Sequence, residues 1–362
     1  MAKTGTTQLQ NTLMLSRDAL LESGILYPDP FPRNNNHRIL LAGHIPFPKL
    51  PRHMRKYGVS NDDLVKGKAD FLTRLASARQ ELNPRTTILS SESFFSFGTG
   101  HVLDGMRLDL ERVGIQEIKV IAYVRRPSAF YVSITQQTIR ASHRIRRPKS
   151  PDYKKRLGTY LASFGRERLE VRKFDRQALF GADIVTDFFE NFLPEFPIER
   201  ITRSLVANET LSGESLAILR RYRMDFCHQQ NDIHTPDSTS LARELKLIDD
   251  RLSLGGPRLH ESISEAIDYS SLDLLWLRDE FEIEFAELDY RRLEKRPSGS
   301  WFTKSISTAM EKLFEPQDLA EIIKLDKEKQ SMIIDELRSS DWARVEEDRK
   351  KWVHTLTSKL IA

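Results

Sequence analysis

The chain has 362 residues, of which 39% are hydrophobic and 30% are charged. These proportions are ordinary for a soluble globular protein, and the length allows one large domain or two smaller ones. The formal net charge of +4 is small for this length, so it gives only weak support for an anionic partner.

The composition also bears on the cellular setting. Cys227 is the only cysteine, which excludes an internal disulfide and favours a reducing compartment. The first residues lack the basic segment and apolar run of a secretory signal. Apolar stretches are all far shorter than the roughly 20 residues that a membrane-spanning helix needs. We therefore expect a soluble, cytoplasmic protein without a transmembrane segment.

The N-terminal 200 residues alternate between helical and extended patterns. From Thr7 to Ser23, leucines recur at roughly helical spacing. The run EIKVIAYV over 117–124 is β-branched and almost continuously apolar, as in a parallel strand buried on both faces. Further strands are predicted at 24–27, 86–92 and 168–175, and further helices at 61–82, 104–114, 127–140 and 182–193. This order predicts an α/β fold with a mostly parallel central sheet.

Beyond about residue 200 the pattern becomes helical. Helical periodicity occurs in SGESLAILRRYRMDF, SLARELKLIDDRL and LDLLWLRDEFEIEF, and again in the lysine-rich stretch that ends at Ala362. We therefore predict two parts, an α/β core over 1–200 and a helical C-terminal region over 201–362 that packs on the core.

The chain opens with MAKTGTTQLQ, in which Lys3, Thr4, Gly5, Thr6 and Thr7 run directly into a predicted helix. Such a loop offers successive backbone N–H groups, hydroxyl donors and the positive end of the helix dipole. Gly5 permits the close backbone approach that a phosphate requires, and Lys3 adds a positive charge. The common nucleotide loop differs, because its lysine follows the glycines. A polar tail that only caps the helix is the plain alternative.

A second candidate for anion binding follows the strand at 117–124. Arg125 and Arg126 end this strand, Pro127 opens a helix, and Ser133 stands eight residues after Arg125. That spacing puts a hydroxyl about two turns into the helix, so it can converge with a guanidinium on one phosphate. The alternative is a strand end that exposes its arginines to solvent.

Together the two motifs resemble the sulfotransferases that use 3′-phosphoadenosine 5′-phosphosulfate (PAPS), and more narrowly their bacterial, carbohydrate-type branch. The similarity covers residues 3–30 and 86–220 and is poor from about residue 230 onward. It implies a P-loop-type three-layer fold in which Lys3 neutralises the leaving 5′-phosphate and Arg125 and Ser133 hold the 3′-phosphate. The matching residues are Lys3, Thr4, Gly5, Thr6, Thr7, Leu9 and Gln10 in the first motif and Arg125 and Ser133 in the second.

Glu92, in ILSSESFF, is the candidate catalytic base. It stands where a strand runs into a loop at the carboxyl end of the sheet, where open α/β folds bind ligands. Glu92-Ser93-Phe94-Phe95 is similar, but not identical, to the stretch that supplies the base in glycan sulfotransferases. A carboxylate that only caps the next turn is the alternative, and His44 and His37 are rival bases.

The resemblance implies in-line transfer of a sulfuryl group from PAPS to a hydroxyl or amine, with no metal. The expected acceptor is a carbohydrate or another hydroxylated small molecule, bound on the side of the C-terminal region. The basic stretch 140–156 suits an anionic donor or an acidic glycan, although a solvated loop explains it equally. This stretch lacks interleaved aromatics, so we expect no nucleic-acid partner. The oligomeric state is not indicated.

Two other functions stay open at this point. A non-catalytic binding protein on a sulfotransferase frame would bind the donor without transferring the sulfuryl group. A P-loop-type kinase would also be α/β, but it should show a standard phosphate loop and an acidic magnesium ligand.

In the family, the first loop follows a strand near the middle of the parallel sheet, and here no residues are available to form it. We therefore expect the neighbouring strands to lack a ladder partner. This feature favours the non-catalytic alternative. It also suggests that Met1 is an internal methionine and that the true start lies upstream.

Overall fold

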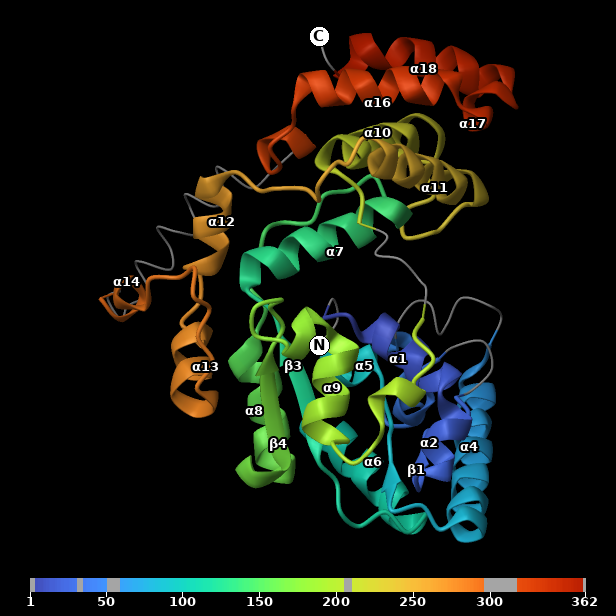
Figure 1. Cartoon of the computed structure of the whole chain (residues 1–362), viewed down its shortest axis with the longest axis vertical. Helices are drawn as coiled ribbons and strands as arrows, with labels where there is room; N and C mark the ends of the chain where they lie inside the picture. The colour runs from blue at the N-terminus through green and yellow to red at the C-terminus, as the bar shows by residue number, and fades with distance from the viewer. Residues whose placement is uncertain (1–3, 31–34, 51–58, 205–209, 296–317, 361–362) are drawn as a thin grey trace. The chain divides into compact units, whose positions relative to one another are not determined.

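The computed structural model describes residues 4–30, 35–50, 59–204, 210–295 and 318–360 (Figure 1). It is mixed α/β and mostly helical, with two small parallel sheets in the described residues. Within these ranges, no helix is both long enough and apolar enough to cross a bilayer. The chain divides into unit 1, residues 1–125, 152–206 and 273–287, and unit 2, residues 126–151, 207–272 and 288–362.

All four predicted strands occur in unit 1, and both pairings are parallel. β1 (Ile25–Leu26) pairs with β2 (Thr86–Thr87), with Ile25 opposite Thr86. β3 (Val120–Val124) pairs with β4 (Leu169–Lys173) over five residues, and the two lie side by side in Figure 1. The strand predicted at 86–92 is shorter in the structure, where β2 ends at Thr87. Beyond it, the Ser90 amide donates to His37 Nδ1 at 3.0 Å and not to a neighbouring strand. The segment after Thr87 is therefore held by a side chain from another loop.

The predicted helices of unit 1 are present, but the one expected over 7–23 is two helices. Ser16 separates them, and its hydroxyl accepts a hydrogen bond from the Thr202 amide at 2.9 Å. The helix predicted at 61–82 has the predicted bounds in the structure. Ser60 and Asp63 form a capping box that fixes its start. The helices of unit 1 are α1 (Thr6–Leu15), α2 (Arg17–Glu22), α4 (Asn61–Leu82), α5 (Glu92–Phe97), α6 (Gly100–Arg112), α8 (Tyr153–Phe164), α9 (Ile184–Phe192) and α13 (Asp273–Phe281).

Short 3₁₀ turns connect several of these elements. They are η1 (Arg38–Leu41), η2 (Phe47–Lys49), η3 (Arg166–Arg168), η4 (Phe180–Ala182) and η5 (Ile198–Arg200) in unit 1, and η6 (Leu319–Glu321) in unit 2.

The core of unit 1 lies on both faces of its parallel strands. One cluster holds Leu9, Leu13 and Phe189 from α1 and α9 together with Ile25 of β1. The other is built on α4, α6 and η1 and includes Leu26, the next residue of β1. Successive residues of a strand point to opposite faces, so β1 contributes one side chain to each cluster. Helices therefore pack on both faces of β1.

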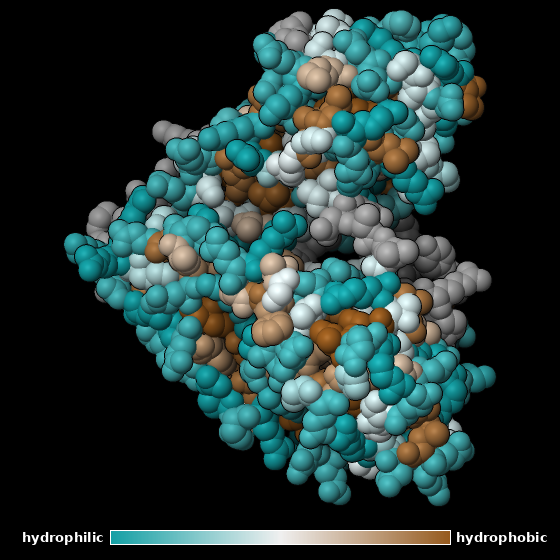
Figure 2. Space-filling view, in the orientation of Figure 1, coloured by the Kyte–Doolittle hydropathy of each residue, from teal (hydrophilic) through white to brown (hydrophobic). Residues whose placement is uncertain are grey.

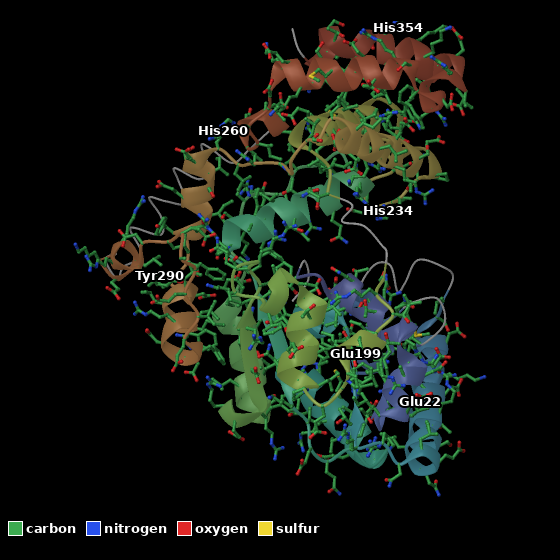
Figure 3. All side chains as sticks on the ribbon, viewed as in Figure 1. Glu22, Glu199, His234, His260, Tyr290 and His354 are labelled. Carbon is green, nitrogen blue, oxygen red and sulfur yellow. The ribbon has the colours of Figure 1, made fainter. Side chains whose placement is uncertain are left out.

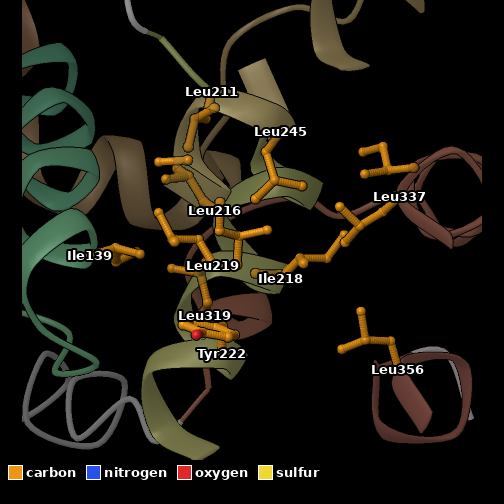
Figure 4. Packing of buried hydrophobic residues seen from close by; sticks show 14 of the residues in the cluster. Ile139, Leu211, Leu216, Ile218, Leu219, Tyr222, Leu245, Leu319, Leu337 and Leu356 are labelled. Carbon is orange, nitrogen blue, oxygen red and sulfur yellow. The ribbon is translucent and has the colours of Figure 1, made fainter. Parts of the chain in front are cut away.

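Unit 2 is helical in its described part, apart from an isolated antiparallel bridge between Leu259 and Ile323. Unit 2 differs from the predicted region 201–362, because it includes residues 126–151 and lacks residues 273–287, so that division of the chain stays a prediction. Figure 4 shows the apolar core, in which Leu216, Leu219 and Tyr222 of α10 pack with side chains from neighbouring helices. The helices are α7 (Pro127–Ala141), α10 (Gly213–Phe226), α11 (Pro236–Arg251), α12 (Glu261–Asp268), α14 (Tyr290–Glu294), α16 (Lys327–Ser339), α17 (Asp341–Arg344) and α18 (Glu347–Leu360).

A buried arginine organises one end of this helical core. Arg223 of α10 is fully buried, and its guanidinium donates to the carbonyl oxygens of Ala141 and Gln230, both at 2.7 Å. It also donates to Ser238 Oγ at 2.7 Å. One side chain thus joins the end of α7, the loop before α11 and α11 itself.

Hydrophilic side chains cover most of the face shown in Figure 2, with apolar side chains in smaller patches. In unit 2, the labelled histidines of Figure 3 come from three separate elements: the loop before α11 (His234), the N-cap of α12 (His260) and α18 (His354).

Candidate functional site

The Thr4–Thr7 loop makes a tight turn at the start of α1. Gly5 has φ of 69° and ψ of 10°, in the left-handed region that glycine adopts without strain. A β-carbon at this position would lie 2.9 Å from Ile184 Cγ2 and 3.2 Å from Phe174 Cε2. Glycine is therefore required both by the backbone conformation and by the lack of space.

The amides that follow Gly5 belong to the open first turn of α1. The Leu9 N–H donates to the Gly5 carbonyl at 3.2 Å, which starts the helical hydrogen-bond series. The amides of Thr6, Thr7 and Gln8 precede this bond, and α1 has no acidic residue in its first turn. A helix start of this kind favours an anion.

Glu92 comes to this loop from a distant part of the sequence. It is the first residue of α5, and its Oε1 accepts a hydrogen bond from Thr6 Oγ1. A second contact supports the arrangement, because the buried Gln10 donates through Nε2 to Ser90 Oγ at 3.0 Å. The structure therefore brings the predicted base and the predicted phosphosulfate loop together.

Arg125 approaches the loop through a shared aromatic ring. It follows β3 directly, and its guanidinium carbon lies 5.5 Å from the centre of the Phe174 ring. The same ring lies beside Gly5, because its Cε2 is 3.2 Å from the place that a β-carbon of residue 5 would take. Phe174 follows β4, and its amide donates to the Val124 carbonyl at 2.7 Å. The parallel β3–β4 pair thus positions Arg125 beside the Gly5 loop.

Arg125 is half-buried at the end of β3. Burial lowers the pKa of its guanidinium, and the neighbouring Arg176 lowers it further, although Tyr153 acts in the opposite direction. The Tyr153 hydroxyl also donates to the Arg125 carbonyl, which fixes the backbone at the strand end. Such a group stays charged at neutral pH and attracts anions strongly when half-buried.

The adjacent arginine has a different role. Arg126 donates through Nε to Asp268 Oδ2 at 2.9 Å, and the Ser128 amide donates to the other oxygen of this carboxylate at 2.8 Å. This pair caps the start of α7 within unit 2. Of the two arginines predicted at the strand end, Arg125 is the one that belongs to the site.

His37, one of the rival bases, has both ring nitrogens engaged. It is fully buried, its Nε2 lies 3.0 Å from the Pro28 carbonyl, and its Nδ1 accepts from the Ser90 amide at 3.0 Å. Burial lowers the pKa of His37 to about 4, so the ring is neutral at physiological pH. The geometry gives it a structural task, holding the segment that leads to Glu92.

His44, the other rival, lies in a cluster with two charged side chains. Its Nε2 is 2.7 Å from Asp109 Oδ2, and the Lys68 ammonium donates to the same oxygen at 2.9 Å. Asp109 is buried, which by itself raises its pKa, but hydrogen bonds from Lys68 and His44 outweigh this and lower it.

The remaining predicted residues are placed as follows. Lys3 lies outside the described residues, Thr4 is buried and Thr7 is exposed. Ser133 is half-buried in α7 and belongs to unit 2, so its pairing with Arg125 stays a prediction. The basic stretch 140–156 divides between the units at residue 151.

Two residues of the site were not predicted from the sequence. Phe174 joins Gly5 to Arg125, and Ser90 receives the Gln10 amide. Their positions offer a usable signal, because each lies just beyond the carboxyl end of a parallel strand. In open α/β sheets, side chains at such positions gather at one edge.

No protein-family model, no curated protein and no solved structure matches this chain.

Proposed function

We propose that this chain is a PAPS-dependent sulfotransferase whose donor site is built around the Gly5 loop. The observation that carries the proposal is the hydrogen bond between Thr6 and Glu92, which are 86 residues apart in the sequence. It puts a carboxylate beside a helix start suited to phosphate. In such an enzyme the catalytic base must lie next to the loop that binds the phosphosulfate, because the sulfur that is attacked is bonded to the 5′-phosphate.

The proposed reaction is in-line displacement at sulfur. Glu92 takes the proton from an acceptor hydroxyl or amine, and the oxygen or nitrogen forms a bond to sulfur as the bond to the 5′-phosphate oxygen breaks. Lys3 and the amides after Gly5 stabilise the charge on this leaving oxygen, and no metal is needed. Arg125 and Ser133 bind the 3′-phosphate, and a carbohydrate is the proposed acceptor.

The finer fold assignment is part of the same proposal. A P-loop-type three-layer arrangement is supported by the parallel strands of unit 1, by the helical clusters on both of their faces and by the loop at their carboxyl ends.

A non-catalytic donor-binding protein is the second candidate. It is favoured by one observation, that β2 and β3 belong to separate two-stranded sheets in the described chain. A site suspended between two short sheets is less rigid than one on a continuous sheet, and transfer requires closer positioning than binding does.

Comparison of donor binding with transfer separates these candidates. Thermal unfolding is followed with and without adenosine 3′,5′-bisphosphate, and transfer of labelled sulfate from PAPS is measured over a panel of glycans and amines. A sulfotransferase is expected to show both, with stabilisation of about 2.7 kcal/mol at 100 times the dissociation constant. Glu92→Gln should keep the stabilisation and lose at least 100-fold in transfer rate.

The outcomes that contradict the proposal are distinct. Stabilisation without transfer to any acceptor would favour the non-catalytic candidate. Absence of stabilisation by the bisphosphate would reject both candidates. The control is Glu111→Gln, which changes an exposed carboxylate of α6 that pairs with Arg107 and should leave both measurements unaltered.

A further inference from the structure

α5 is too short to fix its own orientation. It has six residues, and its first residue, Glu92, is the proposed base. Helices of this length are not stable by themselves in water, so contacts with other elements must hold α5 in place. Thr6 holds its first residue through the hydrogen bond to Glu92. The position of Glu92 therefore depends also on what holds the other end of α5.

Arg156 of α8 holds that other end. The hydrogen bond that closes α5 runs from the Gly98 amide to the Phe94 carbonyl, at 2.8 Å. The carbonyls of Phe95 and Ser96 follow it and have no partner within the helix. Arg156 donates to both through Nη1, at 3.1 Å and 2.8 Å, and its positive charge suits a helix C-terminus. Arg156 thus caps the helix that carries the proposed base.

Two further contacts join α8 to α5. The guanidinium carbon of Arg156 lies 5.7 Å from the centre of the Phe95 ring, within the range of a cation–π interaction. One turn farther along α8, the Tyr160 hydroxyl lies 2.8 Å from the place that a β-carbon of Gly98 would take. Residues 156 and 160 share one face of α8, because they are four apart. This face therefore packs directly on the end of α5.

The first turn of α8 also holds Arg125, the proposed ligand of the 3′-phosphate. Tyr153 is the first residue of α8 and is fully buried, and its hydroxyl donates to the Arg125 carbonyl. Tyr153 lies three residues before Arg156, so the two side chains are neighbours on the helix surface. One turn of α8 is thus in contact with both halves of the candidate site.

α13 fixes this turn in its place within unit 1. The amides of a first helical turn have no partner within the helix, and the N-cap residue Asp152 makes no side-chain capping bond. Instead, the Lys154 amide donates to Oδ2 of Asp273, the first residue of α13, at 3.1 Å. A helix start that is capped from a second helix is held firmly enough to serve as a spacer.

We propose that Tyr153 and Arg156 are positioning residues that set the distance between Glu92 and Arg125. This role rests on the proposed function. Arg156 acts on the base through α5, and Tyr153 acts on the donor through the backbone of Arg125. Because a misplacement of about 1 Å can lower a rate about 100-fold, the loss of either contact should be measurable.

Two substitutions separate the two roles. Arg156→Met keeps the length of the side chain and removes its donors. It should lower the turnover of sulfate transfer, over the same panel of glycans and amines, about 10-fold or more and leave the affinity for adenosine 3′,5′-bisphosphate unchanged. Arg156→Lys, which can still donate to a carbonyl, should recover part of the turnover. Tyr153→Phe should instead weaken bisphosphate binding about 3-fold or more. The control is Arg74→Met, at an exposed position of α4, which should alter neither measurement.

Amide hydrogen exchange tests the contact with α5 without any ligand. In Arg156→Met, the Gly98 amide should exchange about 10-fold faster or more, because α5 loses its cap. The Gly165 amide, which donates to the Leu161 carbonyl at the end of α8, should exchange as before. Tyr153→Phe should leave the exchange at Gly98 unchanged.

Four results would overturn the inference. Unchanged exchange at Gly98 in Arg156→Met would show that Arg156 does not hold α5. Equal losses of binding and turnover in both variants would show that this turn of α8 serves only the fold. Normal binding and turnover in both variants would reject the positioning roles and leave the proposed function intact. If the unaltered chain neither binds the bisphosphate nor transfers sulfate, the proposed function fails and the positioning roles fail with it.

Discussion

Gly5 is the residue on which the proposed donor site depends most. Its φ is 69°, and a β-carbon at this position would lie only 2.9 Å from Ile184 Cγ2, so the site does not accommodate a side chain. Gly5→Ala should cost at least 1–2 kcal/mol from the left-handed backbone alone and weaken binding of adenosine 3′,5′-bisphosphate more than 10-fold. Calorimetric titration and urea unfolding measure the two effects.

Gly100 provides a matched control in the same unit. It opens α6, and a β-carbon there would have no atom within 4 Å. Gly100→Ala should therefore be neutral or slightly stabilising, since alanine favours the helix. If the two substitutions had the same effect on binding, the account of the Gly5 loop would be wrong.

His37 makes the stability of the fold sensitive to acid. Burial lowers its native pKa to about 4, whereas an unfolded histidine has a pKa near 6.5. Between these values the unfolded chain binds the proton and the native chain does not, so stability falls as the pH falls. The loss should reach roughly 2.5 kcal/mol between pH 7.5 and pH 4.5.

Urea unfolding at a series of pH values measures this loss. His37→Gln removes the titrating group, so the loss of unfolding free energy between pH 7.5 and pH 4.5 should be smaller by that amount. This holds whatever the effect of the substitution on stability at neutral pH. His101→Gln, at an exposed position of α6, should leave the slope as it is. An unchanged slope in the His37 variant would contradict the buried, neutral state.

At the scale of the element, α10 depends on its buried arginine. The Arg223 guanidinium donates to four carbonyl oxygens and to Ser238 Oγ, which are more acceptors than the three N–H groups of an ammonium can serve. Arg223→Lys should destabilise the protein by about 3 kcal/mol or more, because carbonyl groups are left buried without a donor. Arg221→Lys, on the same helix, changes a partly exposed pair with Asp225 and should cost less than about 1 kcal/mol. Similar losses in urea unfolding would refute this assignment.

The elements differ in how far the sequence determines them. α4 could be predicted to the residue, since its capping box and apolar spacing are local. The strand at 86–92 could not, because its second half is held by His37 from another loop. The break at Ser16 also coincides with a distant contact, since the Ser16 hydroxyl accepts a hydrogen bond from the Thr202 amide. Local signals predict where elements occur, and distant hydrogen bonds decide where they end.

The candidate site shows the same limit. Gly5, Thr6, Glu92 and Arg125 could be selected from the sequence by residue type and position. Their convergence could not, because it depends on Phe174 and on the contact between Gln10 and Ser90. These contacts arise from the packing of helices against short strands, which no local pattern encodes.

For the whole molecule, the central proposal is that the chain binds a nucleotide with a phosphate on its 3′-position. The direct test is calorimetric titration of the chain with adenosine 3′,5′-bisphosphate and, separately, with adenosine 5′-phosphate. Hydrogen bonds to a charged group contribute about 1.5–3 kcal/mol, so the bisphosphate should bind about 10- to 150-fold more tightly. Arg125→Ala should remove this preference. Equal affinity for the two nucleotides, or no binding of either, would contradict the account.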